Sequence, residues 1–183
     1  MALLPYSLAR PFLFRLDAED AHDVTLAALA RLQGTPLAGT WRNAPVADPI
    51  ELAGLRFPNR VGLAAGLDKN ARCIDAFAGM GFGFVEVGSV TPRPQEGNPR
   101  PRLFRLAGDR AVINRMGFNN DGLDAVFERL RRLTRVHGVI GANVGANKDS
   151  ADRIADYAEG VRRLAPVARY LTNVSVMRTI GPG

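Results

Sequence analysis

Short apolar runs alternate with longer amphipathic stretches after about residue 50, and this alternation limits the possible fold more than any other feature. The predicted strands span residues 61–65, 84–88, 139–144 and 170–174. The predicted helices span residues 71–80, 122–133 and 150–164. Buried strands separated by helices are typical of parallel βα units. Two hairpins are expected as additions, one around Gly54 and one that pairs residues 102–106 with 111–114.

The residues at the ends of these strands indicate where a ligand would bind. Gly, Asn, Lys and Ser occur at these positions. Parallel βα units that close into an eight-stranded barrel carry their chemistry at the carboxyl ends of the strands. The sequence therefore predicts an α/β fold of the (β/α)8 TIM barrel type. Such a barrel typically needs about 250 residues, so we expect the 183-residue chain to hold about the first half of it.

The first 40 residues follow a different pattern and are expected to form a separate helical segment. Apolar residues recur at helical spacing up to Leu32, with a helix start predicted at Asp17. Amphipathic helices of this kind either cap a domain or lie in a membrane interface, and the pattern leaves both possibilities open. Residues 35–48 are interpreted as a linker, which divides the chain into 1–40 and 41–183.

Composition excludes several classes of protein. The single cysteine, Cys73, rules out a disulfide framework and is predicted to be a small core residue, and no Cys/His cluster has zinc-site spacing. The net charge of +6 is compatible with a solvated surface or with an anionic membrane partner. The sequence lacks the interleaved basic and aromatic patch that would indicate nucleic-acid binding. No stretch approaches the roughly 18 uninterrupted apolar residues of a spanning helix.

The first candidate binding segment follows the first predicted strand and reads AAGLDKN, residues 64–70. Its small residues would allow a ligand to approach the backbone closely. Lys69 would place a positive charge beside an anionic substrate or a reduced flavin. An ordinary βα turn with a surface lysine is the alternative, and the spacing alone leaves both open.

The second candidate segment reads INRMGFNN, residues 113–120. Its asparagines offer amide donors and acceptors that suit an imide or a ring carbonyl, and Arg115 offers a guanidinium or a structural ion pair. Asparagine-rich loops are also common as turns and helix caps. The pattern is compatible with a ligand site and with a simple turn.

The third candidate segment reads GANVGANK, residues 141–148, at the end of the third predicted strand. Asn143 interrupts an apolar strand, where an unpaired amide is costly. Either a polar ligand inside the barrel or a hydrogen bond to a neighbouring strand would satisfy it. Asn173 raises the same question in the fourth strand.

Taken together, these segments resemble the class 2, quinone-dependent dihydroorotate dehydrogenases. The resemblance is carried by GLAAGLDK (62–69), GFGFVEVGSVTPRPQ (81–95), PRLFRL (101–106), INRMGFNN (113–120) and NVGANK (143–148). It runs in order from the N-terminal helices to about Tyr170. Several long segments in series are far more specific than any one of them.

The resemblance implies a TIM barrel with FMN across its C-terminal mouth. Such an enzyme oxidises dihydroorotate to orotate for UMP synthesis and passes the electrons to ubiquinone. The residues implied to contact FMN are Ala65, Gly66, Leu67, Asp68, Lys69, Ser89, Asn143 and Asn173. Those implied to hold the substrate are Lys69, Asn114, Arg115, Met116, Gly117, Phe118 and Asn173. No metal ion and no nucleic-acid partner is expected.

The resemblance also assigns a role to the N-terminal helices. They would form a peripheral membrane anchor around a quinone tunnel at the cytoplasmic face of the inner membrane. His22 and Arg105 would line this tunnel. A surface histidine at position 22 is the alternative.

The resemblance fails after Asn173. The family segment NVSSPNTPG, whose second serine is the catalytic base, is replaced here by NVSVMRTIGPG. The base position falls on Val176, which cannot accept a proton, and Arg178 replaces a substrate-binding asparagine. Ser175 is a poor substitute because successive strand residues point to opposite faces. We therefore expect this chain to be inactive, and a truncated or degenerate non-catalytic member of the family is the alternative reading.

Overall fold

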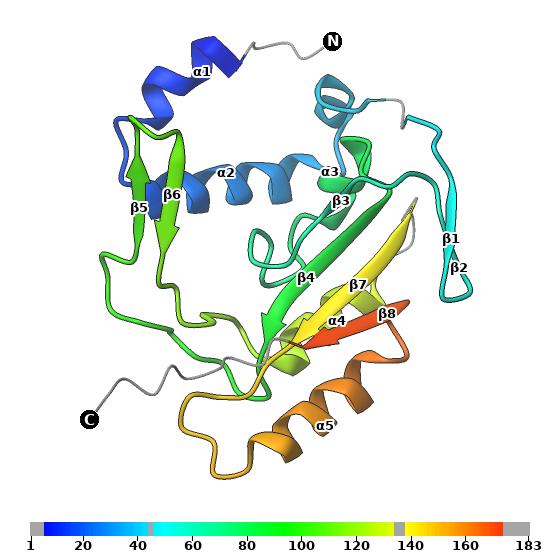
Figure 1. The fold of residues 1–183 in the computed structure, drawn as a ribbon. Coiled ribbons are helices and arrows are strands. Elements are labelled where there is room, and N and C mark those ends of the chain that lie inside the picture. The colour runs from blue at the N-terminus through cyan, green and yellow to red at the C-terminus, as the bar shows by residue number, and fades with distance from the viewer. Residues whose placement is uncertain (1–5, 44–45, 134–137, 174–183) are drawn as a thin grey trace.

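The computed structural model describes residues 6–43, 46–133 and 138–173, and at its centre lies a four-stranded parallel sheet (Figure 1). Its strands are β3 (Gly62–Leu63), β4 (Phe84–Val90), β7 (Val139–Val144) and β8 (Tyr170–Asn173), in that spatial order. The connections between them contain helices α3 (Ile74–Gly79), α4 (Leu123–Arg131) and α5 (Arg153–Leu164). The predicted succession of parallel βα units is confirmed.

The helix-facing side of this sheet forms the main hydrophobic core. All six residues of β7 are buried, as is usual for a strand that is covered on both faces. The central members of the cluster are almost fully buried: Val87, Val90, Val126, Val144 and Leu164. A second cluster joins α3 to α2 and contains Cys73, which confirms its predicted place in the core.

The other side of the sheet, here called the inner face, carries aromatic residues at the amino ends of its strands. Phe84 and Tyr170 pack with Phe57 from the first hairpin, with ring centroids 5.3–6.4 Å apart. Glycines make room for two of these rings. A Cβ atom on Gly62 or Gly141 would lie 2.1 Å from the ring of Phe84 or Tyr170, respectively. The aromatic cluster therefore closes the end of the sheet opposite the predicted site.

Several predicted elements differ from those observed. Strand β3 has two residues instead of five, and α3 begins at Ile74 instead of Ala71. Ala71 has φ +57°, which no α-helix accommodates, and the Asp68 carboxylate accepts hydrogen bonds from the amides of Arg72 and Cys73. The predicted linker also contains a short 3-10 helix, η1 (Pro36–Thr40).

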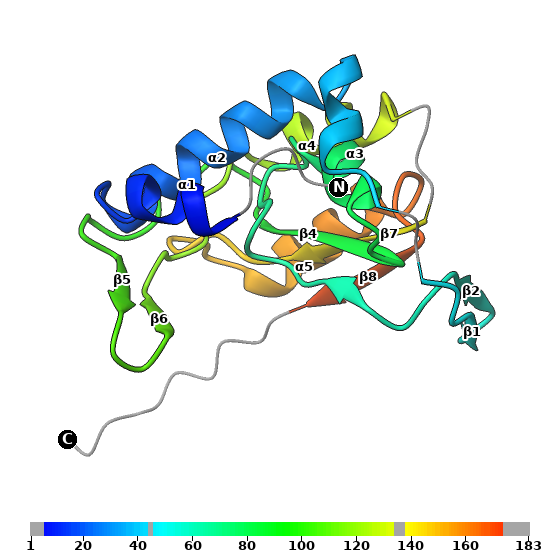
Figure 2. The same cartoon turned by 90° about the horizontal axis from the view of Figure 1, so that it is seen from above.

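Two helices and two hairpins surround the sheet (Figure 2). These elements are α1 (Tyr6–Leu13), α2 (Ala18–Leu32), the hairpin β1 (Ile50–Leu52) with β2 (Leu55–Phe57), and the hairpin β5 (Leu103–Leu106) with β6 (Ala111–Asn114). The Asp17 side chain caps α2 by accepting a hydrogen bond from Glu19 N at 2.8 Å, as predicted. Among the described residues, no helix is both long and apolar enough to cross a bilayer.

A buried ion pair fastens α2 to the base of the second hairpin. Arg102 Nη2 lies 2.6 Å from Glu19 Oε1, and both side chains are less than a tenth exposed. Arg102 also donates to the carbonyls of Glu96 and Asn98. Arg100 Nη2 also lies 3.1 Å from Glu19 Oε1, and removing Glu19 would leave the buried Arg102 guanidinium without its carboxylate partner. This pair sets the position of α2 beside the candidate site.

Candidate functional site

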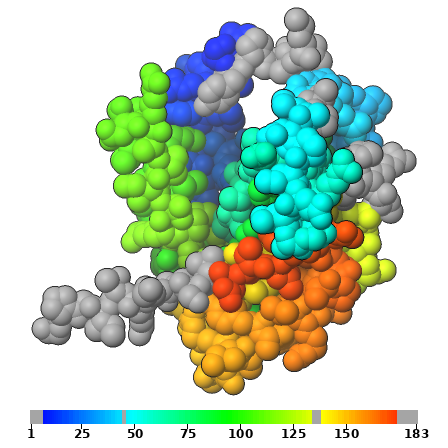
Figure 3. All heavy atoms as spheres, turned by 45° about the vertical axis from the view of Figure 1, so that its right-hand side comes forward, coloured from blue at the N-terminus to red at the C-terminus, as the bar shows by residue number. Residues whose placement is uncertain are grey.

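The central cavity, about 600 Å³ in volume, lies where α2, the loop after β3, the end of β4 and the second hairpin meet. It is lined by His22, Ala65, Gly66, Leu67, Lys69, Ser89, Leu103, Val112, Asn114, Met116, Gly117 and Phe118. Figure 3 shows a recess beside the light-green hairpin, with the blue α2 behind it. The structure thus gathers most of the predicted site residues around one space.

The loop of residues 64–70 is held against β4 by its own backbone. Gly66 N donates to Gly88 O at 2.8 Å, and Gly66 has φ +109°, a conformation that favours glycine. Asp68 does not line the cavity. Its buried carboxylate accepts hydrogen bonds from the backbone amides of Arg72 and Cys73. These bonds hold the turn that follows the loop.

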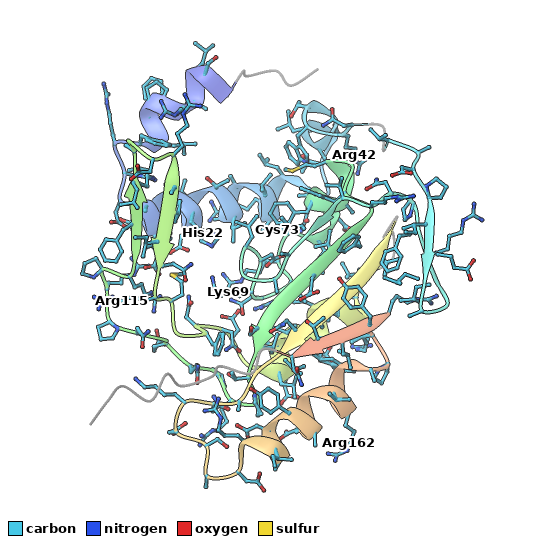
Figure 4. All side chains as sticks on the ribbon, viewed as in Figure 1. His22, Arg42, Lys69, Cys73, Arg115 and Arg162 are labelled. Atoms are coloured by element: carbon cyan, nitrogen blue, oxygen red, sulfur yellow. The ribbon has the colours of Figure 1, made fainter. Side chains whose placement is uncertain are left out.

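Lys69 projects toward the cavity, as Figure 4 shows together with His22. Its ammonium group donates to Gly66 O at 2.8 Å. Burial, and then the nearby positive charge of Arg102, lowers the pKa of Lys69. Lys69 is thus a partly buried side chain on the cavity wall.

The segment 114–118 forms the opposite wall. Gly117 and Phe118 have φ values of +76° and +55°, and a Cβ atom on Gly117 would lie 2.7 Å from Asn98 N. This turn brings Asn114, Met116 and Phe118 to the cavity. The Arg115 guanidinium instead turns outward and donates to Pro101 O, so the structure does not bring it into the site.

Asn143 is 3% exposed and does not line the cavity. Its Oδ1 accepts a hydrogen bond from the Ser89 hydroxyl, and its Nδ2 donates to Thr172 Oγ1 at 2.8 Å. The hydrogen bond to neighbouring strands is thus the observed arrangement, although Ser89 itself does reach the cavity. Asn173 is exposed at the end of β8 and also lies away from the lining.

His22 is partly buried and lines the cavity. Burial, and then the charge of Lys69, lowers the pKa of His22. Arg105 lies elsewhere. Its guanidinium donates to the carbonyls of Leu13 and Leu16 and sits 4.7 Å from the centre of the Phe14 ring. The positions Ser175, Val176 and Arg178 lie outside the described residues.

Sequence reasoning missed two sets of residues. Leu103 and Val112 add an apolar wall from the hairpin, and nothing in their local pattern distinguished them from hairpin surface. Glu86 accepts a hydrogen bond from Thr172 Oγ1 at 2.8 Å on the inner face of the sheet. A carboxylate within the apolar run FVEVG was the available signal for this second set.

A family model described as dihydroorotate dehydrogenase matches residues 49–181. The chain belongs to the dihydroorotate dehydrogenase family. Proteins named dihydroorotate dehydrogenase (quinone) from Methylibium petroleiphilum and Novosphingobium aromaticivorans are 56% and 60% identical to it over 98% of its length. The aligned regions make up 54% and 52% of those two proteins. The chain therefore spans about half the length of the curated relatives it matches.

Solved dihydroorotate dehydrogenase structures share the fold. The enzyme from Eimeria tenella in complex with ferulenol superposes with a TM-score of 0.76 at 44% identity, over 89% of this chain and 45% of that one. Its ligand-free form gives a TM-score of 0.74 at 46% identity, over 86% of this chain and 45% of that one. Together with the parallel sheet, these matches confirm the TIM-barrel family.

Proposed function

We propose that this chain provides the flavin and substrate site of a quinone-dependent dihydroorotate dehydrogenase, which oxidises dihydroorotate to orotate in UMP synthesis. The observation that carries the proposal is the convergence of residues 65–69, Ser89 and residues 114–118 on one cavity. These segments are far apart in sequence and come from three different elements. Membership of the dihydroorotate dehydrogenase family favours the oxidation of dihydroorotate as the reaction in this cavity.

The cavity suits a flavin ring. Ala65 and Gly66 leave the backbone accessible to a flat ligand, Met116 adds an apolar surface, and Ser89 adds a polar atom. In this proposal Ala65, Gly66, Leu67, Lys69 and Ser89 contact FMN, while Asp68 and Asn143 hold those contacts in place. FMN would supply the redox chemistry by taking a hydride from the substrate and passing electrons to quinone.

The wall opposite the loop suits dihydroorotate. Asn114 offers an amide for the ring carbonyls and N–H groups, while Met116, Gly117 and Phe118 shape the pocket. Dihydroorotate is a carboxylate, and the Lys69 ammonium provides the complementary charge. Arg115 contributes only its backbone, because its guanidinium faces outward. Asn173 remains a predicted contact from the end of β8.

The helical segment 1–40 suits the membrane side of such an enzyme. Exposed apolar residues cluster on α1, in the α1–α2 junction and on the second hairpin: Leu8, Phe12, Phe14, Leu16, Val112 and Ile113. Arginines 10 and 15 lie among them. Apolar and basic residues together favour peripheral binding at an anionic interface. We place this surface at the cytoplasmic face of the inner membrane, with ubiquinone entering beside His22 and with Arg105 bracing the α1–α2 junction.

A second candidate is a non-catalytic member of the same family. The specific observation that favours it is Val176 at the position of the catalytic base. In that case the chain would bind flavin and dihydroorotate without forming orotate.

Anaerobic addition of dihydroorotate to the FMN-loaded chain separates these possibilities. Loss of the visible flavin absorption, orotate formation and reoxidation by a quinone would support the enzyme. Flavin binding without bleaching would support the non-catalytic reading, and failure to bind FMN would contradict both. Lys69→Ala is expected to weaken substrate binding, whereas Arg162→Ala removes an exposed charge on α5 and serves as the control (Figure 4).

A further inference from the structure

Four hydrogen-bonded side chains cross the inner face of the sheet, and we call them the Glu86 chain. Ser89 Oγ donates to Asn143 Oδ1, Asn143 Nδ2 donates to Thr172 Oγ1, and Thr172 Oγ1 donates to Glu86 Oε1. The two latter bonds are each 2.8 Å long. The chain thus links a carboxylate inside the sheet to a hydroxyl on the cavity wall.

The direction of every bond in the Glu86 chain follows from the carboxylate. An ionised carboxylate only accepts hydrogen bonds, so the Thr172 hydrogen must point to Glu86. Thr172 can then only accept from its other neighbour, which places the Asn143 NH2 group beside it. The Asn143 oxygen therefore faces Ser89, and the single hydroxyl hydrogen of Ser89 is used on Asn143.

The surroundings keep this direction fixed. Ser89 and Asn143 are 7% and 3% exposed, so water has little access to the bonds that join them. Strands β4 and β7 approach so closely here that a Cβ atom on Gly88 would lie 2.3 Å from Asn143 O. Among the described residues, no cation forms an ion pair with Glu86. Hydroxyl groups that donate hydrogen bonds to the carboxylate, such as that of Thr172, therefore stabilise its negative charge.

We propose that Glu86 is a positioning residue which, through Thr172 and Asn143, holds Ser89 as a pure hydrogen-bond acceptor toward the ligand of the central cavity. Ser89 Oγ would then accept from a ligand N–H and disfavour a carbonyl oxygen or an unprotonated ring nitrogen at the same place. With flavin as the ligand, the partner is a ring N–H. That last step rests on the proposed function.

Glu86→Gln is the decisive variant because it changes little besides the charge. Glutamine can donate as well as accept, so the chain can reverse and the Ser89 hydrogen can turn toward the ligand. We expect FMN affinity to fall by roughly 3- to 10-fold, the range of one net hydrogen bond, with a shift of the flavin absorption bands. Thr172→Val should reproduce this effect and Thr172→Ser should not.

Two comparisons separate positioning from a general structural role. The double variant Glu86→Gln/Thr172→Val should lose no more affinity than either single variant, because both act through one chain. The control is Arg162→Ala, which removes an exposed charge on α5 that takes no part in these hydrogen bonds. It should leave FMN affinity unchanged. Wild-type affinity and spectrum in both Glu86→Gln and Thr172→Val would overturn the proposal.

A measurement without flavin keeps this inference distinct from the proposed function. In the apo protein, the Asn143 side-chain NH2 signals should exchange slowly with solvent and lose that protection in Glu86→Gln. If the wild-type protein binds no FMN, the proposed function fails. Protected Asn143 signals would still support the proposed direction of the hydrogen bonds in the Glu86 chain. Rapid exchange of these signals in the wild type would overturn the inference by itself.

Discussion

The two faces of the central sheet are built on different principles. On the helix-facing side, residues such as Val87 and Val144 are at most 1% exposed and belong to one apolar cluster with residues of α4 and α5. On the inner side, the same strands carry aromatic rings at one end and the hydrogen-bonded Glu86 chain toward the other. Apolar packing depends on volume, whereas hydrogen bonding depends on direction. The first face should therefore control stability and the second should control what binds.

The largest loss of stability is expected from the helix-facing side. Leu164→Ala removes a fully buried side chain of α5 and should lower the free energy of unfolding by about 2–5 kcal/mol. Urea denaturation measures this change. Val161→Ala, on the same helix at a position that is 45% exposed, is the matched control and should have a much smaller effect. Equal losses in the two variants would contradict the assigned core.

A smaller loss is expected from overpacking the inner face. Gly141→Ala would place a Cβ atom 2.1 Å from the Tyr170 ring and should cost about 1–3 kcal/mol. At Gly145 the nearest atom is 3.6 Å away, so Gly145→Ala should be tolerated. Thermal unfolding of the two variants provides the comparison. A stable Gly141→Ala protein would show that the aromatic end of the sheet is looser than described.

Ser89→Ala should separate binding from folding. The change removes one buried hydrogen bond to Asn143 and should lower stability by about 1 kcal/mol. FMN affinity should fall at the same time, because the acceptor on the cavity wall is lost. Fluorescence titration of FMN against the variant measures the second effect. Unchanged affinity would place Ser89 outside the ligand contacts.

The smallest effect is expected from His22 and concerns pH. Its pKa is lowered in the folded state, so the unfolded chain binds more protons on acidification. This contribution to stability is present above the unfolded pKa of about 6.5 and is lost as the pH falls from there through the lower pKa of the folded state. His22→Gln should flatten the stability profile in that window. An identical pH profile in the variant would show that His22 titrates as it does when unfolded.

Much of the fold was predictable because strand and helix periodicity is local. The parallel βα succession, both hairpins and the start of α2 at Asp17 follow from patterns within about ten residues. The start of α3 was not predictable in this way. It depends on the positive φ of Ala71 and on backbone hydrogen bonds to Asp68, neither of which alters the apolar spacing.

The site was predictable where a segment acts by itself and not where partners are distant in sequence. The segments around Lys69 and Met116 were identified from their composition and their family resemblance, and both line the cavity. The surroundings of Asn143 depend on Ser89 and Thr172 from neighbouring strands, which no local pattern connects. The Glu19–Arg102 pair joins positions 83 residues apart and was missed for the same reason.

The Arg102 guanidinium has a mechanical consequence for the cavity. Because it binds the Glu19 carboxylate and the carbonyls of Glu96 and Asn98 at once, α2 and the base of the second hairpin are fastened into one body. Moving α2 or the hairpin by itself would separate the Glu19 and Arg102 charges while they remain buried, which is energetically costly. We therefore expect α2 and the hairpin to move as one unit if the cavity widens around a larger ligand.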